Sequence, residues 1–166
     1  MSENTLLQNP VIPPAPKAFT HKDIVNAAWE YLSKRCNVVL PEFFCWNGEL
    51  ADVIGFKGDI STLIECKISR ADFIKDRAKP FRINQAKGMG DRRYYCCPKG
   101  LIKKEELPEK WGLLYVYPSG LVREIKDAGR LEKNLNAEFH LLYYYARRAN
   151  YAGVHQRIIE YRGFDK

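Results

Sequence analysis

Three charged residues interrupt two otherwise apolar runs of the sequence. Asp52 lies within residues 50–56, and Glu65 and Lys67 lie within residues 60–68. A charge in a half-buried strand is costly unless it is paired or binds a metal. Two carboxylates repel each other, and Mg²⁺, which prefers oxygen ligands, relieves that repulsion and keeps positions for water and phosphate. A nearby ammonium can orient a metal-bound water and stabilise phosphate charge, so this set predicts a minimal site for phosphodiester hydrolysis.

The elements that must position these residues form a predicted β-hairpin. The two apolar runs meet at Lys57-Gly58-Asp59, which is typical of a tight turn between antiparallel strands. Pairing about that turn brings Asp52 near Glu65. Because strand side chains alternate, Glu65 and Lys67 share a face and Cys66 points the other way. The alternative interpretation is a surface ion pair on an ordinary hairpin.

At these positions the sequence resembles the PD-(D/E)XK nuclease superfamily. Ala51-Asp52-Val53 is similar to the first motif, with Ala51 where the eponymous proline stands, and Glu65-Cys66-Lys67 matches the second motif in full. Residues 69–77 look most like the MmcB-like DNA-repair subgroup and related phage proteins. The Leu-Pro-x-x-Trp-Gly-Leu-Leu run at 107–114 extends the resemblance, which covers roughly residues 20–125.

The resemblance implies a Mg²⁺- or Mn²⁺-dependent deoxyribonuclease in DNA repair or phage nucleic-acid processing. Asp52, Glu65 and the backbone carbonyl of Cys66 are then the expected metal ligands, and Lys67 serves the attacking water and the scissile phosphate. In the superfamily an acidic residue of the first helix often reaches the metal, which makes Glu30 a candidate. Its alternative is a solvent-facing helix glutamate. Some superfamily members also place a glutamine near the site, which makes Gln85 a further candidate.

The order of predicted elements indicates an α/β domain. We expect a restriction-endonuclease-like mixed central β-sheet flanked by helices, with a C-terminal helical extension. The chain of 166 residues is long enough for one domain with a proper core. The predicted helices span residues 21–35, 69–77 and 131–148, and the predicted strands span 37–46, 50–56, 60–68, 92–97, 111–117 and 121–125. Thr20 and Asp23 predict a capping box for the first helix, and Pro80 is expected to end or kink the second.

Three segments follow from this order. Residues 1–18 are a Pro-rich N-terminal arm, residues 19–127 are the nuclease-like core, and residues 128–166 are a C-terminal helical extension packed on the core. Within the extension, Leu135, Phe139, Leu142 and Tyr143 have helical apolar spacing. Its mixture of tyrosines and arginines can stack bases and grip phosphates, or can belong to a helix packed on the sheet with its hydroxyl groups in water.

Positive charge is concentrated in one segment. The chain carries a net charge of +7, and residues 70–104 hold eleven Lys or Arg and three Asp, a net charge of +8. Such a segment suits a polyanionic partner, DNA or RNA, although a solvated basic face is the alternative. The expected phosphate contacts are Arg70, Lys75, Arg77, Lys79, Arg82 and Lys87. Asp72 and Asp76 are expected to pair with these basic residues, and Gly88-Met89-Gly90 to form a flexible stretch that could close over a substrate.

Cysteine usage and hydropathy restrict the setting. Five cysteines without C-x-x-C spacing argue against zinc, and Cys66, Cys96 and Cys97 are expected to be small buried side chains. The sequence shows no signal peptide and no apolar run long enough to span a membrane, so we expect a cytoplasmic protein without membrane contact. A homodimer is left open. The rival function is a non-catalytic nucleic-acid-binding or protein-interaction domain on the same fold.

Overall fold

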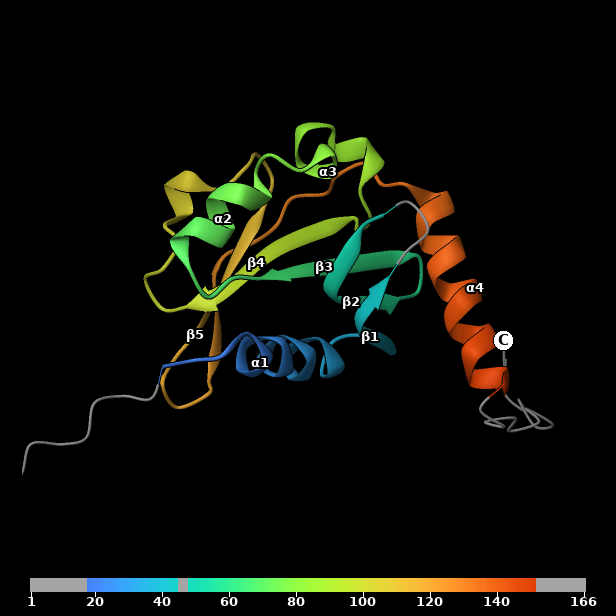
Figure 1. Ribbon diagram of the computed structural model, residues 1–166, viewed down its shortest axis with the longest axis horizontal. Coiled ribbons are helices and arrows are strands. Elements are labelled where there is room, and N and C mark those ends of the chain that lie inside the picture. Colours follow the sequence, from blue (N-terminus) through green and yellow to red (C-terminus); the bar gives the residue numbers. More distant parts are fainter. Residues whose placement is uncertain (1–17, 45–47, 152–166) are drawn as a thin grey trace, which may run out of the picture.

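A mixed six-stranded β-sheet organises the chain, which a computed structural model describes over residues 18–44 and 48–151. The strands lie side by side in sequence order (Figure 1): β1 (Val38–Phe44), β2 (Leu50–Lys57), β3 (Ile60–Cys66), β4 (Arg92–Pro98), β5 (Gly112–Val116) and β6 (Val122–Lys126). The β1–β2, β2–β3 and β5–β6 pairs are antiparallel, whereas β3–β4 and β4–β5 are parallel. The predicted α/β class with a mixed sheet is confirmed.

Helices cover both faces of the sheet. The helix α1 (His21–Ser33) lies on one face, and α2 (Arg70–Asp76) and α3 (Pro80–Ile83) lie on the other (Figure 1). Two short 3₁₀ turns, η1 (Gln85–Lys87) and η2 (Lys104–Glu106), precede β4 and β5. The C-terminal helix α4 (Leu135–Tyr151) lies beside the β1–β2–β3 end of the sheet. No helix in the described ranges is long and apolar enough to cross a membrane.

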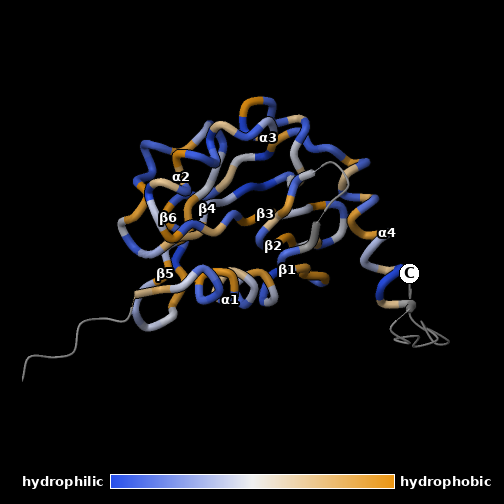
Figure 2. The backbone as a smooth tube through the Cα atoms, in the orientation of Figure 1, coloured by the Kyte–Doolittle hydropathy of each residue, from blue (hydrophilic) through white to orange (hydrophobic). Residues whose placement is uncertain are grey.

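The first helix forms as its sequence predicts. Thr20 Oγ1 accepts the N–H of Asp23, and Asp23 accepts the N–H of Thr20 at 2.8 Å, which completes the capping box. Hydrophobic and hydrophilic residues interleave along α1 (Figure 2), so that Ile24, Ala28 and Leu32 turn toward the sheet and are buried.

The alternation of strand side chains divides the core into two layers. Val53, Ile64 and Cys66 pack toward α1, whereas Ile54 and Leu63 pack in the opposite layer. That second layer also contains the fully buried rings of Phe73, Tyr95 and Trp111. Because side chains alternate along a strand, Asp52 and Glu65 share this second face. The charged residues of interest therefore lie on the side of α2, with Cys66 facing away from them, as predicted.

The segment between α3 and β4 is packed, not free to move over a substrate. Met89 is fully buried and its N–H donates to Glu49 at 2.8 Å. Gly90 has a φ of +90°, and a Cβ at this position would lie 2.8 Å from the Cβ of Leu63. The expectation of a flexible stretch at 88–90 is therefore wrong. Nor does Pro80 end the second helix, since α2 ends at Asp76 and Pro80 begins α3.

The C-terminal helix packs through a different face from the predicted one. Ala137, Glu138 and Leu141 are buried, whereas Leu135 and Phe139 are 67% and 64% exposed. Apolar spacing missed the true packing face because that face centres on a carboxylate. Glu138 accepts hydrogen bonds from Ser61 Oγ at 2.6 Å and the Gly90 N–H at 2.8 Å. The helix also begins at Leu135, later than predicted, and the arm predicted at 1–18 lies almost wholly outside the described residues.

Candidate active site

The β2–β3 hairpin brings Asp52 and Glu65 to one cleft. The register pairs Val53 with Ile64, so Asp52 and Glu65 are the next residues on each strand. Asp52 Oδ2 accepts the backbone N–H of Cys66 at 2.6 Å, which ties the end of β3 to β2. Asp52, Glu65 and Lys67 line a cleft of about 340 Å³, together with residues of α2 and His21 of α1. The predicted convergence of the three residues is present in the structure.

Asp52 is the buried carboxylate of the cleft that lacks a Lys or Arg partner among the described residues. Among the described residues its ion-pair partner is His21, whose Nε2 lies 3.5 Å from Oδ1 and which carries charge only when protonated. Burial, and after it the charge of Glu65, raises the pKa of Asp52 to about 6. A cation bound beside Asp52 would counteract both of these effects and favour the ionised carboxylate.

Glu65 is held by two cations. Its Oε2 lies 3.0 Å from Lys67 Nζ, and its Oε1 lies 2.8 Å from Arg82 Nη2, with Glu65 and Arg82 both almost fully buried. The second contact is an ion pair without hydrogen-bond alignment, so Oε1 has no hydrogen-bond partner in the described structure. Burial acts to lower the pKa of Lys67, but the charges of Glu65 and Asp76 outweigh it and raise that pKa.

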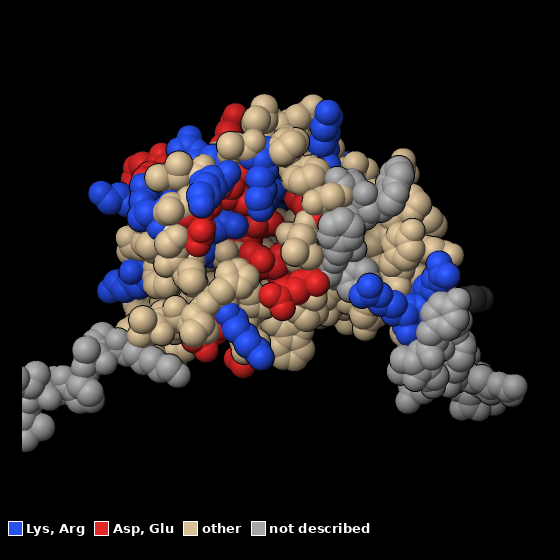
Figure 3. Space-filling model, in the orientation of Figure 1, with Lys and Arg blue, Asp and Glu red and all other residues tan. Residues whose placement is uncertain are grey.

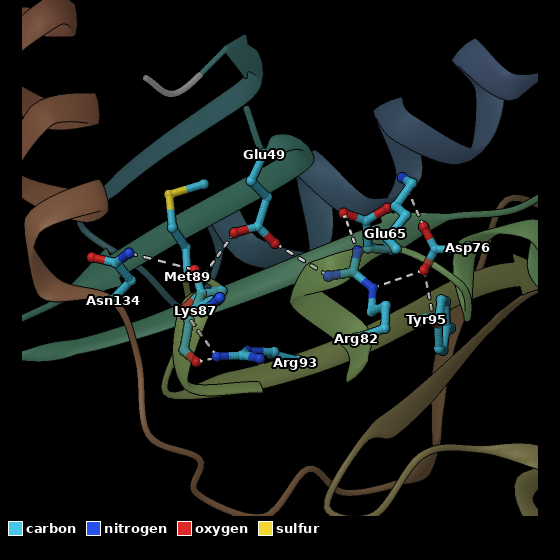
Figure 4. Close-up of polar contacts among 12 residues, drawn as sticks. Glu49, Glu65, Asp76, Arg82, Lys87, Met89, Arg93, Tyr95 and Asn134 are labelled. Carbon is cyan, nitrogen blue, oxygen red and sulfur yellow. Dashed lines mark hydrogen bonds and ion pairs between the residues drawn. The ribbon is translucent and has the colours of Figure 1, made fainter. Parts of the chain in front are cut away.

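Asp76, the last residue of α2, joins the same network (Figure 4). Its Oδ2 accepts from Arg82 Nε at 2.8 Å and from the Tyr95 hydroxyl at 2.7 Å. Its Oδ1 lies 2.8 Å from Lys79 Nζ and 3.3 Å from Lys67 Nζ. Burial opposes ionisation of Asp76, yet the charges of Arg82 and Lys67 prevail and lower its pKa, so it is a carboxylate at neutral pH.

Arg82 is the centre of this arrangement. Its Nη1 donates to Glu49 Oε1 at 3.2 Å, and its guanidinium carbon lies 4.8 Å from the centre of the Trp111 ring. The planar guanidinium thus contacts three carboxylates and an aromatic face, which suits arginine better than lysine. Arg82 was predicted to bind phosphate, and this expectation is wrong because the side chain is buried and paired.

A comparison with known proteins bears on the fold and not on the site. The chain is similar in structure to a protein of unknown function from Silicibacter pomeroyi. That likeness has a TM-score of 0.60 at 22% identity and covers 90% of this chain and all of the other. No family model matches the sequence, and no curated protein matches it. The likeness supports the α/β architecture, and the assignment of the site rests on its geometry.

The charge balance of the network decides whether a metal ion fits. Three buried carboxylates are matched by three cations: Glu49, Glu65 and Asp76 against Arg82, Lys67 and Lys79. Asp52 is the remaining buried carboxylate of the cleft, and Glu65 Oε1, like Asp76 Oδ1, is a buried oxygen of the network without a hydrogen bond in the described structure. The oxygen donors of Asp52 and Glu65 suit a hard divalent cation. Within residues 18–44 and 48–151, no three His, Cys, Asp or Glu side chains are arranged to hold a metal, so a backbone carbonyl, water or phosphate would have to complete the ligands of such an ion.

Two other predicted site residues lie elsewhere. Glu30 lines a separate hollow between α1 and the β5–β6 turn, so a role at the Asp52–Glu65 cleft is excluded by its place on the helix. Gln85 belongs to η1 and lines a third hollow with Glu109 and Lys110.

Cys66, Cys96 and Cys97 are buried as expected. The pKa of the Cys66 thiol is raised well above its usual value, mainly by a hydrogen bond with Cys96 and secondly by burial.

The predicted phosphate contacts separate into groups. Lys75 and Lys79 line the cleft, whereas Arg77 and Lys87 are exposed outside its lining. Arg70 forms a two-pronged ion pair with Glu106, which ties α2 to η2 and occupies its guanidinium. Figure 3 shows acidic side chains gathered at the centre of this face, with Lys and Arg gathered beside them over α2 and α3. The expected pairing with basic residues is present for Asp76, whereas Asp72 forms no ion pair among the described residues.

Glu49 is the site residue that the sequence did not reveal. It stands one position before β2 and is almost fully buried, with its Oε2 bonded to the Met89 N–H. Burial raises the pKa of Glu49, although the Met89 N–H and Arg82 counter this. No local pattern marks it, because its partners Arg82 and Met89 lie more than thirty residues away in the chain.

Proposed function

We propose that the chain is a metal-dependent nuclease that hydrolyses DNA phosphodiester bonds in the cleft between α1 and α2. The observation that carries the proposal is the joint placement of Asp52, Glu65 and Lys67 on one cleft wall, with Asp52 left without a Lys or Arg partner among the described residues. A cleft that gathers excess negative charge beside a fixed ammonium suits a divalent cation and a phosphate together.

Each residue of the cleft has a distinct role in this proposal. Asp52 and Glu65, with the backbone carbonyl of Cys66, hold Mg²⁺ or Mn²⁺. The bound ion supplies Lewis-acid stabilisation and lowers the pKa of a coordinated water. Lys67 donates hydrogen bonds to the attacking water and to the scissile phosphate. Its ammonium is already fixed 3.0 Å from Glu65 Oε2, so it needs little reorganisation to act.

Lys75 and Lys79 supply the positive rim of the cleft. Both lie on the α2 side of the lining, and the side chain of Lys79 is 47% exposed. Ammonium groups at this position can contact phosphates on either side of the scissile bond without reading base sequence. The resemblance to the PD-(D/E)XK superfamily adds the proposed setting, DNA repair or phage nucleic-acid processing in the cytoplasm, with RNA as a further substrate class to test.

A second candidate function is a nucleic-acid-binding domain without catalysis. It is favoured by the pairing of Glu49, Glu65 and Asp76 with Arg82, Lys67 and Lys79, which makes the network electrostatically stable by itself. The two candidates differ in their need for a metal. Incubation with circular single-stranded and double-stranded DNA in Mg²⁺, Mn²⁺ or EDTA separates them. Cleavage that EDTA abolishes supports the nuclease, whereas binding without cleavage in any metal supports the second candidate.

A further inference from the structure

Lys67 has two carboxylate neighbours, and only one of them belongs to its own motif. Its Nζ lies 3.0 Å from Glu65 Oε2 on the same strand and 3.3 Å from Asp76 Oδ1 at the end of α2. Lysine has a flexible four-carbon stem and three rotatable N–H donors. With Glu65 alone, the ammonium could swing about a single contact. The ion pair with the second carboxylate, which lacks hydrogen-bond alignment, holds the ammonium from another side and leaves two donors for a water and a phosphate oxygen.

Asp76 is itself firmly held. It is buried, and its Oδ2 accepts from Tyr95 at 2.7 Å and from Arg82 Nε at 2.8 Å. Tyr95 is in turn packed between Phe73, at 5.1 Å edge-to-face, and Trp111, stacked at 4.6 Å between ring centres. A carboxylate with this many fixed partners can act as a rigid anchor for the ammonium group of a flexible lysine side chain.

The same carboxylate orients the second cation that reaches Glu65. Arg82 Nε bonds to Asp76 while its Nη2 lies 2.8 Å from Glu65 Oε1. Asp76 therefore contacts both of the cations that hold Glu65. Its Oδ1 contacts Lys67, and its Oδ2 contacts Arg82. Loss of its charge would release Lys67 and Arg82 together, and both would be drawn more closely to Glu65, the group that the metal must share.

We infer that Asp76, anchored by Tyr95, is a positioning residue of the site: it holds Lys67 and Arg82 so that Glu65 remains available to a metal ion. This inference rests on the proposed function for its catalytic consequence and on the geometry alone for its effect on Lys67. Asp76 contacts two side chains that hold Glu65, and it lies on α2, outside the strand motif that carries Glu65 and Lys67.

The kinetics of DNA cleavage by the Asp76→Asn variant test the catalytic consequence of this positioning role. This variant keeps the size of the side chain and removes its charge. We expect kcat for DNA cleavage to fall by about 10²-fold, as for a misplaced catalytic group, with KM changed by less than about twofold. Asp59→Asn, an exposed aspartate of the β2–β3 turn, is the matched control and should keep wild-type kcat. A rise in KM with unchanged kcat would overturn the inference, since it would place Asp76 in substrate binding.

Nuclear magnetic resonance of ¹³Cε-labelled lysine tests the positioning without any cleavage. In a fixed Lys67 the two Hε protons are inequivalent, and we expect them to merge in Asp76→Asn at constant pH and to stay distinct in Asp59→Asn. Tyr95→Phe removes only the hydroxyl donor to Asp76, so it should fold even if Asp76→Asn does not, with a partial loss in both measurements.

These measurements separate the two hypotheses. Wild-type protein that never cleaves DNA, but whose Lys67 signals merge in Asp76→Asn or in Tyr95→Phe, would refute the proposed nuclease and keep Asp76 as the anchor of Lys67. Lys67 signals unchanged in both variants would refute the positioning role, whether or not the wild-type protein cleaves DNA.

Discussion

Arg82 Nη2 lies 2.8 Å from Glu65 Oε1, and both side chains are only 2% exposed. An arginine from the most basic segment of the sequence is therefore an internal counter-ion of the candidate site and not a contact for DNA. This pairing connects the fold to the function, because the same cation that stabilises the buried carboxylates also restricts how Glu65 can bind a metal.

Removal of Arg82 should destabilise the protein. Arg82→Ala leaves Glu49, Glu65 and Asp76 without their shared cation, and breaking a buried ion pair in this way costs about 3–5 kcal/mol. Arg77→Ala, an exposed neighbour, should change the free energy of unfolding by less than about 0.5 kcal/mol. Urea unfolding of both variants measures the difference. Equal stability of the two would show that the network contributes nothing.

Asp52→Asn should stabilise the metal-free protein at neutral pH. Folding raises the pKa of Asp52 from 3.8 to about 6, so ionisation of this carboxyl disfavours the folded state. Replacing the carboxyl by a neutral amide should raise the free energy of unfolding by on the order of 1–3 kcal/mol above pH 6. This increase should disappear as pH falls from 6 toward 4. Thermal unfolding in EDTA at several pH values measures it.

The same pair of proteins reports on the metal. Mn²⁺ should raise the melting temperature of the wild-type protein, because an ion that binds only the folded state stabilises it by mass action. Asp52→Asn should show little of this effect. Equal stabilisation of the two proteins by Mn²⁺ would place the ion elsewhere.

The sequence predicted the hairpin and its motif well, because both depend on local pattern. The alternation of apolar residues and the Gly58 turn placed Asp52, Glu65 and Lys67 together without any long-range information. Ser69, which accepts the N–H of Asp72, marked the start of α2 in the same local way. Thr20 and Asp23 did so for α1.

The rest of the site depends on contacts between distant segments. Glu49 and Arg82 are 33 residues apart, and a basic segment in the sequence looks alike whether an arginine faces solvent or a buried carboxylate. Arg70 was misjudged for the same reason, since its partner Glu106 lies 36 residues later. The packing of α4 was missed because its buried face includes Glu138, whose partners Ser61 and Gly90 come from other parts of the chain.

DNA affinity should depend on Lys75 and Lys79 and not on basic residues in general. Each phosphate contact adds about 0.9 to the slope of log affinity against log salt for duplex DNA, so Lys75→Gln with Lys79→Gln should reduce the slope by about 2. Lys34→Gln with Lys126→Gln removes the same charge outside the cleft lining and should leave the slope nearly unchanged. Fluorescence anisotropy across a salt series measures both. Equal reductions would assign binding to overall charge.

Loss of Glu138 should loosen α4 without disturbing the cleft. Glu138→Ala removes an acceptor shared by Ser61 Oγ, the Gly90 N–H and Lys133. Ser61 and Lys133 keep Asp91 as a partner, so the Gly90 N–H is the group left unsatisfied, which costs about 1–3 kcal/mol. Hydrogen exchange should become faster in α4 and remain slow in β3 and β4. Uniformly faster exchange across the sheet would show instead that α4 is part of the cooperative core.

The central claim is tested most directly by the initial rate of DNA cleavage in Mn²⁺, compared between the wild-type protein, Glu65→Gln and Lys67→Ala. Both substitutions leave Lys75 and Lys79 in place, so both variants should still bind DNA. We predict that both lose cleavage by orders of magnitude, because electrostatic stabilisation of the transition state is usually the largest catalytic contribution. Wild-type protein that binds DNA in a salt-sensitive way but neither binds Mn²⁺ nor cleaves, or variants that cleave at the wild-type rate, would contradict the account.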